Sequence, residues 1–253
     1  MKFSEKIASF LLVFSAVFYW VHVSGHYNTK VILADLGGLP WLYTSLVTLF
    51  SIITGFIIQK EWDNWNSLLD SVKGEVDALR ELWLWSRHLP EDYKARFDSA
   101  IKKYLEEMAS DGLNKSERQE RSREIEQAFS TIQGTMFEMS QSDSRLMPTT
   151  FSFFIKLIEY RTSRIRYTSH HVPQSLQRTL LFTTFLIIAL SLFIGIKDIW
   201  LDYTFTLSVA LMAFIIYLVV DDLDHPLVRG SWHLTPADYE ALLRQISADR
   251  TGH

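Results

Sequence analysis

Four long stretches of the sequence contain no Asp, Glu, Lys or Arg. They cover residues 7–29, 36–59, 179–196 and 203–220. About 20 helical residues, at ~1.5 Å each, cross the roughly 30 Å hydrocarbon core of a bilayer, so each stretch is long enough to span a membrane. The sequence therefore predicts an all-α membrane protein with four transmembrane helices in two pairs. We place these spans near residues 7–27, 39–59, 179–196 and 203–221.

The first stretch has a second interpretation, a cleaved signal peptide, because Lys2 and Lys6 precede its apolar run. Two features favour an uncleaved anchor. The bulky residues 18–20 are aromatic, as at a membrane interface, and another apolar stretch follows at once.

The segment between the two pairs is highly charged and has helical patterning. Its first helix carries an amphipathic stripe that ends at Leu89-Pro90, and further helices are predicted at about 91–110, closed by Asp111-Gly112, at 116–140 and at 148–167. The stripe comprises Leu68, Leu69, Val72, Val76, Leu79, Leu82, Trp83 and Ser86. A last amphipathic helix is predicted after Thr235-Pro236. The predicted domains are the first helix pair (1–59), a cytoplasmic helical domain (60–178), the second pair (179–221) and a cytoplasmic tail (222–253).

Positive charges near the span ends predict the orientation. With the N-terminus inside, only Lys30 and Lys197 fall in outer loops. The inner flanks then hold Lys2, Lys6, Lys60, Lys73, Arg161, Arg164, Arg166, Arg178 and Arg229. Because cytoplasmic flanks are enriched in Lys and Arg, we expect a multi-pass protein of the cell membrane with both termini in the cytoplasm.

Composition excludes several classes of function. The net charge of −4 gives no attraction to nucleic acid, and the absence of Cys removes disulfides, thiolate nucleophiles and Cys-ligated metals. Phosphate-binding glycine loops and hydrolase, metalloprotease and kinase motifs are missing, which argues against an enzyme. The spans carry no ionisable residue at mid-depth, which argues against proton-coupled or voltage-driven transport. No cofactor is predicted unless calcium binds as described below.

A stripe of small or hydroxylated residues follows one face of the second span. It consists of Thr44, Thr48, Ser51 and Gly55, at steps of four, three and four. Small side chains let transmembrane helices approach closely, and this packing role is the first interpretation. The second is a wetted pore wall, in which hydroxyl groups line an anion path without fixed charge.

An acidic cluster directly follows the fourth span. Asp221, Asp222 and Asp224 lie within four residues, and Glu61 and Asp63 leave the second span at the same membrane level. Several carboxylates suit a hard cation such as calcium. The alternative is a hinge at a helix end, with an aspartate paired to Arg229 or to a nearby arginine.

Two histidines form another metal candidate. His22 and His26 have i,i+4 spacing at the outer end of the first span. The simpler interpretation is a pair of interfacial polar residues.

The sequence resembles the bestrophin-like proteins of bacteria and plants. The residues that carry this resemblance are Glu75, Leu79, Leu82, Pro90, Tyr104, Arg161, Pro173 and the run Asp222-Leu223-Asp224-x-Pro226-x-x-x-Gly230. Family members commonly have Pro-Phe-x-Gly in this run and a Trp shortly after the tyrosine, and this chain departs from both patterns. The resemblance implies two spans, a cytoplasmic helical block and two further spans. Bestrophins proper, to which the family is distantly similar, are pentameric anion channels that are often regulated by calcium through an acidic cluster near the fourth span.

Two functional hypotheses follow. The first is an oligomeric channel-like protein in the lipid bilayer, a homo-oligomer that passes small anions. The alternative is a membrane-anchored helical scaffold that recruits a cytoplasmic partner.

Overall fold

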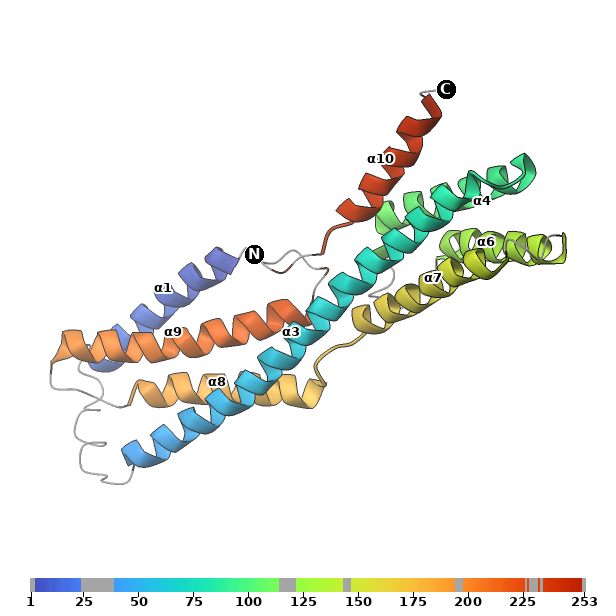
Figure 1. Cartoon of the computed structure of the whole chain (residues 1–253). Coiled ribbons are helices and arrows are strands. Elements are labelled where there is room, and N and C mark those ends of the chain that lie inside the picture. Colours follow the sequence, from blue (N-terminus) through green and yellow to red (C-terminus); the bar gives the residue numbers. More distant parts are fainter. Residues whose placement is uncertain are drawn as a thin grey trace. The chain divides into compact units, whose positions relative to one another are not determined.

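The computed structural model describes residues 3–23, 39–113, 122–142, 147–193, 198–225, 227, 232 and 234–251. Over these residues the structure is helical and contains no strand, as the all-α prediction requires (Figure 1). The chain divides into two compact units. The first comprises Met1–Trp62 and His171–Trp232, and the second comprises Asp63–His170 and His233–His253.

The first unit contains α1 (Phe3–His22), the beginning of α3 (Leu39–Ser86), α8 (Gln174–Ser191) and α9 (Ile199–Asp224). Among the described residues, three helices are long and apolar enough to cross a membrane, namely α1, α3 and α9. They correspond to the first, second and fourth predicted spans, and residues 24–27 of the first span lie outside the described residues. The predicted third span corresponds to α8, which starts with the polar segment Gln174-Ser175 and ends at Ser191, and residues 194–197 lie outside the described part.

Helix α3 is a single continuous helix of 48 residues. The second predicted span and the first predicted cytoplasmic helix are therefore parts of one element. Pro40 lies in its first turn, where proline is favoured, and no further proline occurs before Pro90, so nothing in the sequence interrupts the helix. At ~1.5 Å per residue α3 is about 72 Å long, more than twice the thickness of a hydrocarbon core.

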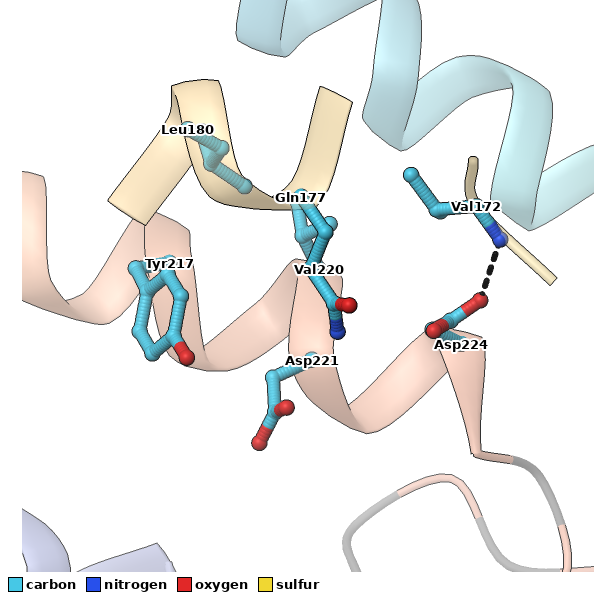
Figure 2. Close-up of a pocket in the computed structure, with 7 residues that line it drawn as sticks. All are labelled: Val172, Gln177, Leu180, Tyr217, Val220, Asp221 and Asp224. Atoms are coloured by element: carbon cyan, nitrogen blue, oxygen red, sulfur yellow. Dashed lines mark hydrogen bonds between the residues drawn. The ribbon is translucent and has the colours of Figure 1, made fainter. Parts of the chain in front are cut away.

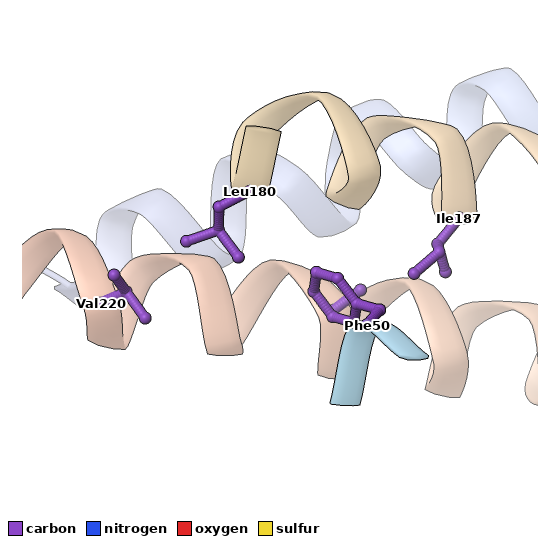
Figure 3. Close-up of a cluster of buried hydrophobic side chains, with 5 residues drawn as sticks. Phe50, Leu180, Ile187 and Val220 are labelled. Carbon is purple, nitrogen blue, oxygen red and sulfur yellow. The ribbon is translucent and has the colours of Figure 1, made fainter. Parts of the chain in front are cut away.

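The core of the first unit joins α3, α8 and α9. Phe50 of α3 packs with Leu180 and Ile187 of α8 and with Ala213 and Val220 of α9 (Figure 3). Asp198 caps α9, because its side chain accepts hydrogen bonds from the backbone N–H groups of Trp200 and Leu201 at 2.9 and 3.1 Å.

A second cluster of the first unit joins α1 to α9. Phe14 and Phe18 of α1 pack with Ala210 of α9, and the rings of Phe10 and Phe214 stack with centroids 4.3 Å apart. Ser15 and Tyr203 share a hydrogen bond of 2.8 Å across the same pair of helices.

The second unit contains the remainder of α3 with α4 (Glu91–Glu107), the π-helix η1 (Met108–Gly112), α6 (Arg123–Ser142), α7 (Met147–Thr168) and α10 (Ala237–Thr251). Helix α4 packs against α6 and α10, and α6 packs against α7. The predicted amphipathic stripe is buried at Leu68, Val72, Val76, Leu79, Leu82, Trp83 and Ser86. The last helix buries Tyr239, Leu242 and Ile246, as its pattern predicted.

The helix that starts at Glu91 was expected to end at Asp111-Gly112. α4 passes at Met108 into the π-helical turn of η1, and η1 ends at Gly112, as predicted. Leu113 still has right-handed helical angles, with φ −67° and ψ −48°, and residues 114–121 lie outside the described residues. The predicted start of the next helix near residue 116 lies outside the described residues, and α6 begins at Arg123.

Candidate functional site

The predicted small-residue stripe lies on an exposed face of α3. Thr44, Thr48, Ser51 and Gly55 are all exposed, and a Cβ atom added at Gly55 would meet no other atom within 4 Å. The hydroxyl groups of Thr48 and Ser51 donate to the carbonyl oxygens of Thr44 and Val47 on their own helix. The described part of this chain therefore does not cover the stripe.

The adjoining face of α3 contacts the other helices of the first unit. Phe50 and Thr54 are buried on this face. The residues of α3 that pack against the core cluster of Phe50, α8 and α9 are Tyr43, Leu46, Val47, Ile57 and Ile58. Large apolar residues occupy the exposed side beyond the stripe, including Ile52, Ile53 and Phe56. In this region α3 thus presents an uncharged surface of small, hydroxylated and large apolar side chains outside its own bundle.

The acidic residues at the end of α9 are engaged by groups of the same unit. The side chain of Asp224 is buried and accepts a hydrogen bond of 2.6 Å from the backbone N–H of Val172 (Figure 2). Asp221 forms a half-exposed ion pair with Lys6 of α1 at 3.3 Å. Asp222 accepts a bond of 3.3 Å from the backbone N–H of Trp232. The cluster thus connects the end of α9 to α1 and to the segment before α8.

Two histidines flank Asp224. The Nδ1 atoms of His171 and His225 lie 3.7 and 3.8 Å from its carboxylate oxygens, and the two rings are 5.7 Å apart. Each Nδ1 also lies 3.0 Å from a backbone oxygen, of Asp224 for His171 and of Asp221 for His225. Within the described part of the chain, no three His, Asp or Glu residues are grouped so that they could hold a metal ion. Arg229, the predicted partner of the cluster, lies outside the described residues, as do Pro226 and Gly230.

The C-terminal end of α1 holds a buried histidine. His22 Nε2 lies 3.6 Å from Asp202 Oδ2, both side chains are almost completely buried, and the ring of Phe18 stacks on the imidazole at 4.2 Å. An imidazole and a carboxylate in this position form a polar contact between α1 and the start of α9. His26, the second member of the predicted metal pair, lies outside the described residues.

The structure also contains a buried polar cluster that the sequence patterns did not reveal. Glu75 of α3 is 0% exposed and Arg164 of α7 is 1% exposed. Arg164 Nε donates to Glu75 Oε2 at 2.5 Å, and Arg164 Nη2 donates to Oε1 at 3.4 Å. The hydroxyl of Tyr104 on α4 donates to the same carboxylate. Tyr239 of α10 is buried beside this pair, so the cluster collects side chains from four helices.

Burial and charge act together on this cluster. Burial raises the pKa of the Tyr104 and Tyr239 hydroxyls above the ordinary value, and the negative charge of Glu75 raises both further. Burial alone would lower the pKa of Arg164, but the charge of Glu75 raises it. The cluster therefore holds one carboxylate, one guanidinium and two neutral phenols.

This arrangement corrects one prediction. Arg164 was expected among the membrane-flanking charges at the C-terminal end of its helix, whereas it lies inside the second unit. Arg161 is also engaged, because it bonds Glu126 at 2.6 Å and its guanidinium stacks on Phe129 at 4.3 Å. A signal was present in the sequence, since Glu75 stands three residues after Val72 and four before Leu79 and therefore shares the apolar face of α3.

A comparison of the sequence with models of protein families shows which family the chain is related to. The bestrophin-like domain matches residues 10–238. The chain belongs to the bestrophin-like family. Together with the apolar helices α1, α3 and α9, this makes it a membrane protein. No curated protein sequence matches the chain.

The bestrophin-like chain also has similar solved structures. Two are crystal structures of point variants of a bacterial bestrophin homologue from Klebsiella pneumoniae. One has a TM-score of 0.74 at 16% identity and covers 98% of this chain and 100% of that chain. The other has a TM-score of 0.72 at 15% identity, with 98% of each chain covered. A crystal structure titled as a point variant of a membrane protein has a TM-score of 0.74 at 17% identity and covers 98% and 99% of the two chains. At these identities the likeness concerns the fold.

Proposed function

We propose that this bestrophin-like protein is an oligomeric channel that passes small anions, with the first half of α3 lining the path. In this proposal four spans in two pairs, near residues 7–27, 39–59, 179–196 and 203–221, anchor a cytoplasmic helical domain of residues 60–178. The amino terminus and the tail of residues 222–253 are cytoplasmic.

The observation that carries the proposal is the exposed stripe of α3. Its residues Thr44, Thr48, Ser51 and Gly55 belong to an apolar helix but are not buried by the described part of the chain. Small and hydroxylated side chains gain little from facing lipid, whereas they suit close contact with another helix or with water. One α3 cannot enclose a path, so a pore built from this face needs several copies of the chain.

The chemistry of this face favours anions over cations. Residues 39–59 contain no Asp or Glu, so no carboxylate repels an anion along the span. Hydroxyl groups at Thr48 and Ser51 can turn from their own helix toward an ion, and the edge of the exposed Phe56 ring carries a positive partial charge. Exposed Ile52 and Phe56 also supply apolar bulk of the kind that gates pores by loss of water.

Two substitutions on opposite sides of α3 test the proposal. At about 100° per residue, Ile53 lies about 200° around the helix from Ser51, and both side chains are exposed. We expect Ser51→Leu to reduce chloride flux through liposomes or to disturb assembly, because it adds bulk to the stripe. Ile53→Leu keeps the size and apolar character of a side chain on the other face and should leave both unchanged. If the two variants conduct and assemble alike, the stripe faces lipid and the proposal is wrong.

A further inference from the structure

The last helix covers the buried ion pair of the second unit. Tyr239 of α10 is completely buried, and its hydroxyl lies close enough to Glu75 and Arg164 for both charges to act on it. Helix α10 packs against α4 and η1, whereas Ala241 and Arg244 on its other side are exposed. It is therefore an outer element of the unit that reaches the interior with one aromatic side chain.

The attachment of α10 to the unit is narrow. Among its described side chains, Tyr239, Leu242 and Ile246 are buried, at steps of three and four. Outside this seam, Asp249 accepts a hydrogen bond of 2.5 Å from Arg87, the residue directly after α3, and both side chains are half-exposed. Three buried side chains and one exposed ion pair thus attach a helix of 15 residues.

A helix attached in this way keeps its structure chiefly through docking. Isolated helices of about 12–15 residues are only marginally stable in water. Proteins open locally, and elements with few buried contacts open at a lower free energy than the domain as a whole. Undocking therefore unfolds α10 and admits water to the side of the Glu75–Arg164 pair that Tyr239 covers.

We propose that α10 is a strap that opens and closes over the Glu75–Arg164 pair without unfolding of the second unit. In the closed state Tyr239 excludes water from the pair. In the open state water hydrates both charges and weakens their attraction, because charges interact less strongly in water than in a protein interior. Glu75 belongs to α3 and Arg164 to α7, so opening loosens the contact between these two helices. The strap thus links the carboxyl-terminal tail to the packing of α3, and this inference does not depend on ion conduction.

Hydrogen–deuterium exchange of the full-length protein in lipid nanodiscs, followed by mass spectrometry of its peptides, tests the strap. We expect the backbone amides of α10 to exchange at least about tenfold faster than those of α4, because local opening needs less free energy than global unfolding. Tyr239→Ala removes the cover of the ion pair and should speed exchange both in α10 and in α7 around Arg164. Tyr239→Phe keeps the aromatic ring and should leave both rates close to those of the unaltered protein.

Two milder variants keep the test sharp if Tyr239→Ala does not fold. Arg87→Gln removes the ion pair with Asp249 and should speed exchange in α10 by up to about fivefold, the factor expected for one exposed ion pair. Arg96→Gln is the matched control, because it removes an exposed ion pair between Arg96 of α4 and Glu138 of α6 and should leave the exchange of α10 unchanged.

Two results would overturn the proposal. Equal exchange of α10 and α4, with no separate effect of Arg87→Gln on α10, would mean that α10 opens only when the whole unit unfolds. Faster exchange of α10 in Tyr239→Ala with unchanged exchange around Arg164 would mean that the ion pair does not depend on the strap.

Discussion

Glu75 and Arg164 place a full carboxylate and a full guanidinium in the interior of the second unit. Removing two such charges from water costs several kcal/mol per ion, and their attraction offsets this only when the geometry is good and other hydrogen bonds complete the site. Here two N–H groups of Arg164 and the hydroxyl of Tyr104 all donate hydrogen bonds to the Glu75 carboxylate. The pair therefore depends on having both members present.

Substitution of Glu75 should be strongly destabilising. Glu75→Gln leaves the Arg164 guanidinium buried without its counter-charge, and we expect a loss of about 3–5 kcal/mol in the free energy of unfolding. Asp77→Asn is the matched control, because Asp77 pairs with Arg80 on the surface of the same helix and should cost less than about 1 kcal/mol. Thermal unfolding of the two variants in detergent measures the difference. Similar melting temperatures would show that the buried pair contributes no more than a surface pair.

Asp224 should stabilise the contact between the C-terminal end of α9 and the segment before α8. Asp224→Asn weakens the acceptor of the buried Val172 N–H, and we expect a loss of about 1–3 kcal/mol. Asp221→Asn removes only the half-exposed pair with Lys6 and should cost less than about 1 kcal/mol.

The effect of calcium on thermal stability distinguishes a structural role of the acidic cluster from cation binding. We expect millimolar calcium to leave the melting temperature unchanged, because Lys6 and the Val172 N–H already engage Asp221 and Asp224. A stabilisation of about 2.7 kcal/mol at a hundredfold excess over the dissociation constant would instead indicate a bound cation.

Helices α3 and α7 approach closely at a glycine. A Cβ atom added at Gly74 would lie 2.4 Å from a ring carbon of Tyr160, too close for any ordinary contact. Glycine at this position therefore lets the ring of Tyr160 lie directly against the backbone of α3.

Two glycine substitutions should have opposite effects. Gly74→Ala forces the Tyr160 ring to move, and we expect a loss of about 1–3 kcal/mol. Gly134→Ala in α6 meets no atom within 4 Å and should gain up to about 1 kcal/mol, because alanine is the better helix former. Adding Tyr160→Ala to Gly74→Ala should relieve the clash, and thermal unfolding of the single and double variants checks this. Additive effects of Gly74→Ala and Tyr160→Ala would contradict the proposed contact.

The helices that could be predicted from the sequence are those with a clear apolar period. The stripe from Leu68 to Ser86 and the face of α10 at Tyr239, Leu242 and Ile246 are buried as expected, because a period near 3.6 selects one side of a helix. The helix end predicted at Asp111-Gly112 agrees with the end of η1 at Gly112, whereas the change from α-helix to π-helix at Met108 was not predicted.

The polar sites were harder to predict because they depend on partners distant in the sequence. Arg164 has the charge of a membrane flank, and its burial follows only from Glu75, 89 residues away. The pairing of Asp221 with Lys6 joins the end of α9 to α1, across 215 residues. The acidic cluster itself was visible in the sequence, but whether its charges face a cation, an arginine or a lysine depends on the tertiary fold.

The proposed topology can be tested by labelling the whole protein in the membrane. Single cysteines are unambiguous here because the chain contains no Cys. We expect cysteines at positions 30 and 197 to react with an impermeant reagent added outside, and cysteines at positions 115 and 252 to be protected until the membrane is opened, because the Lys and Arg distribution favours this orientation. Reaction at position 115 from outside would overturn the arrangement of two helix pairs around a cytoplasmic domain.

Anion flux through the purified protein in liposomes tests the proposed function most directly. The account predicts chloride efflux that depends on the protein, together with a mass in detergent of several 29.5 kDa chains. A tight liposome preparation that contains the correctly oriented protein but shows no chloride flux, with the mass of a single chain in detergent, would contradict the channel and favour a membrane-anchored scaffold.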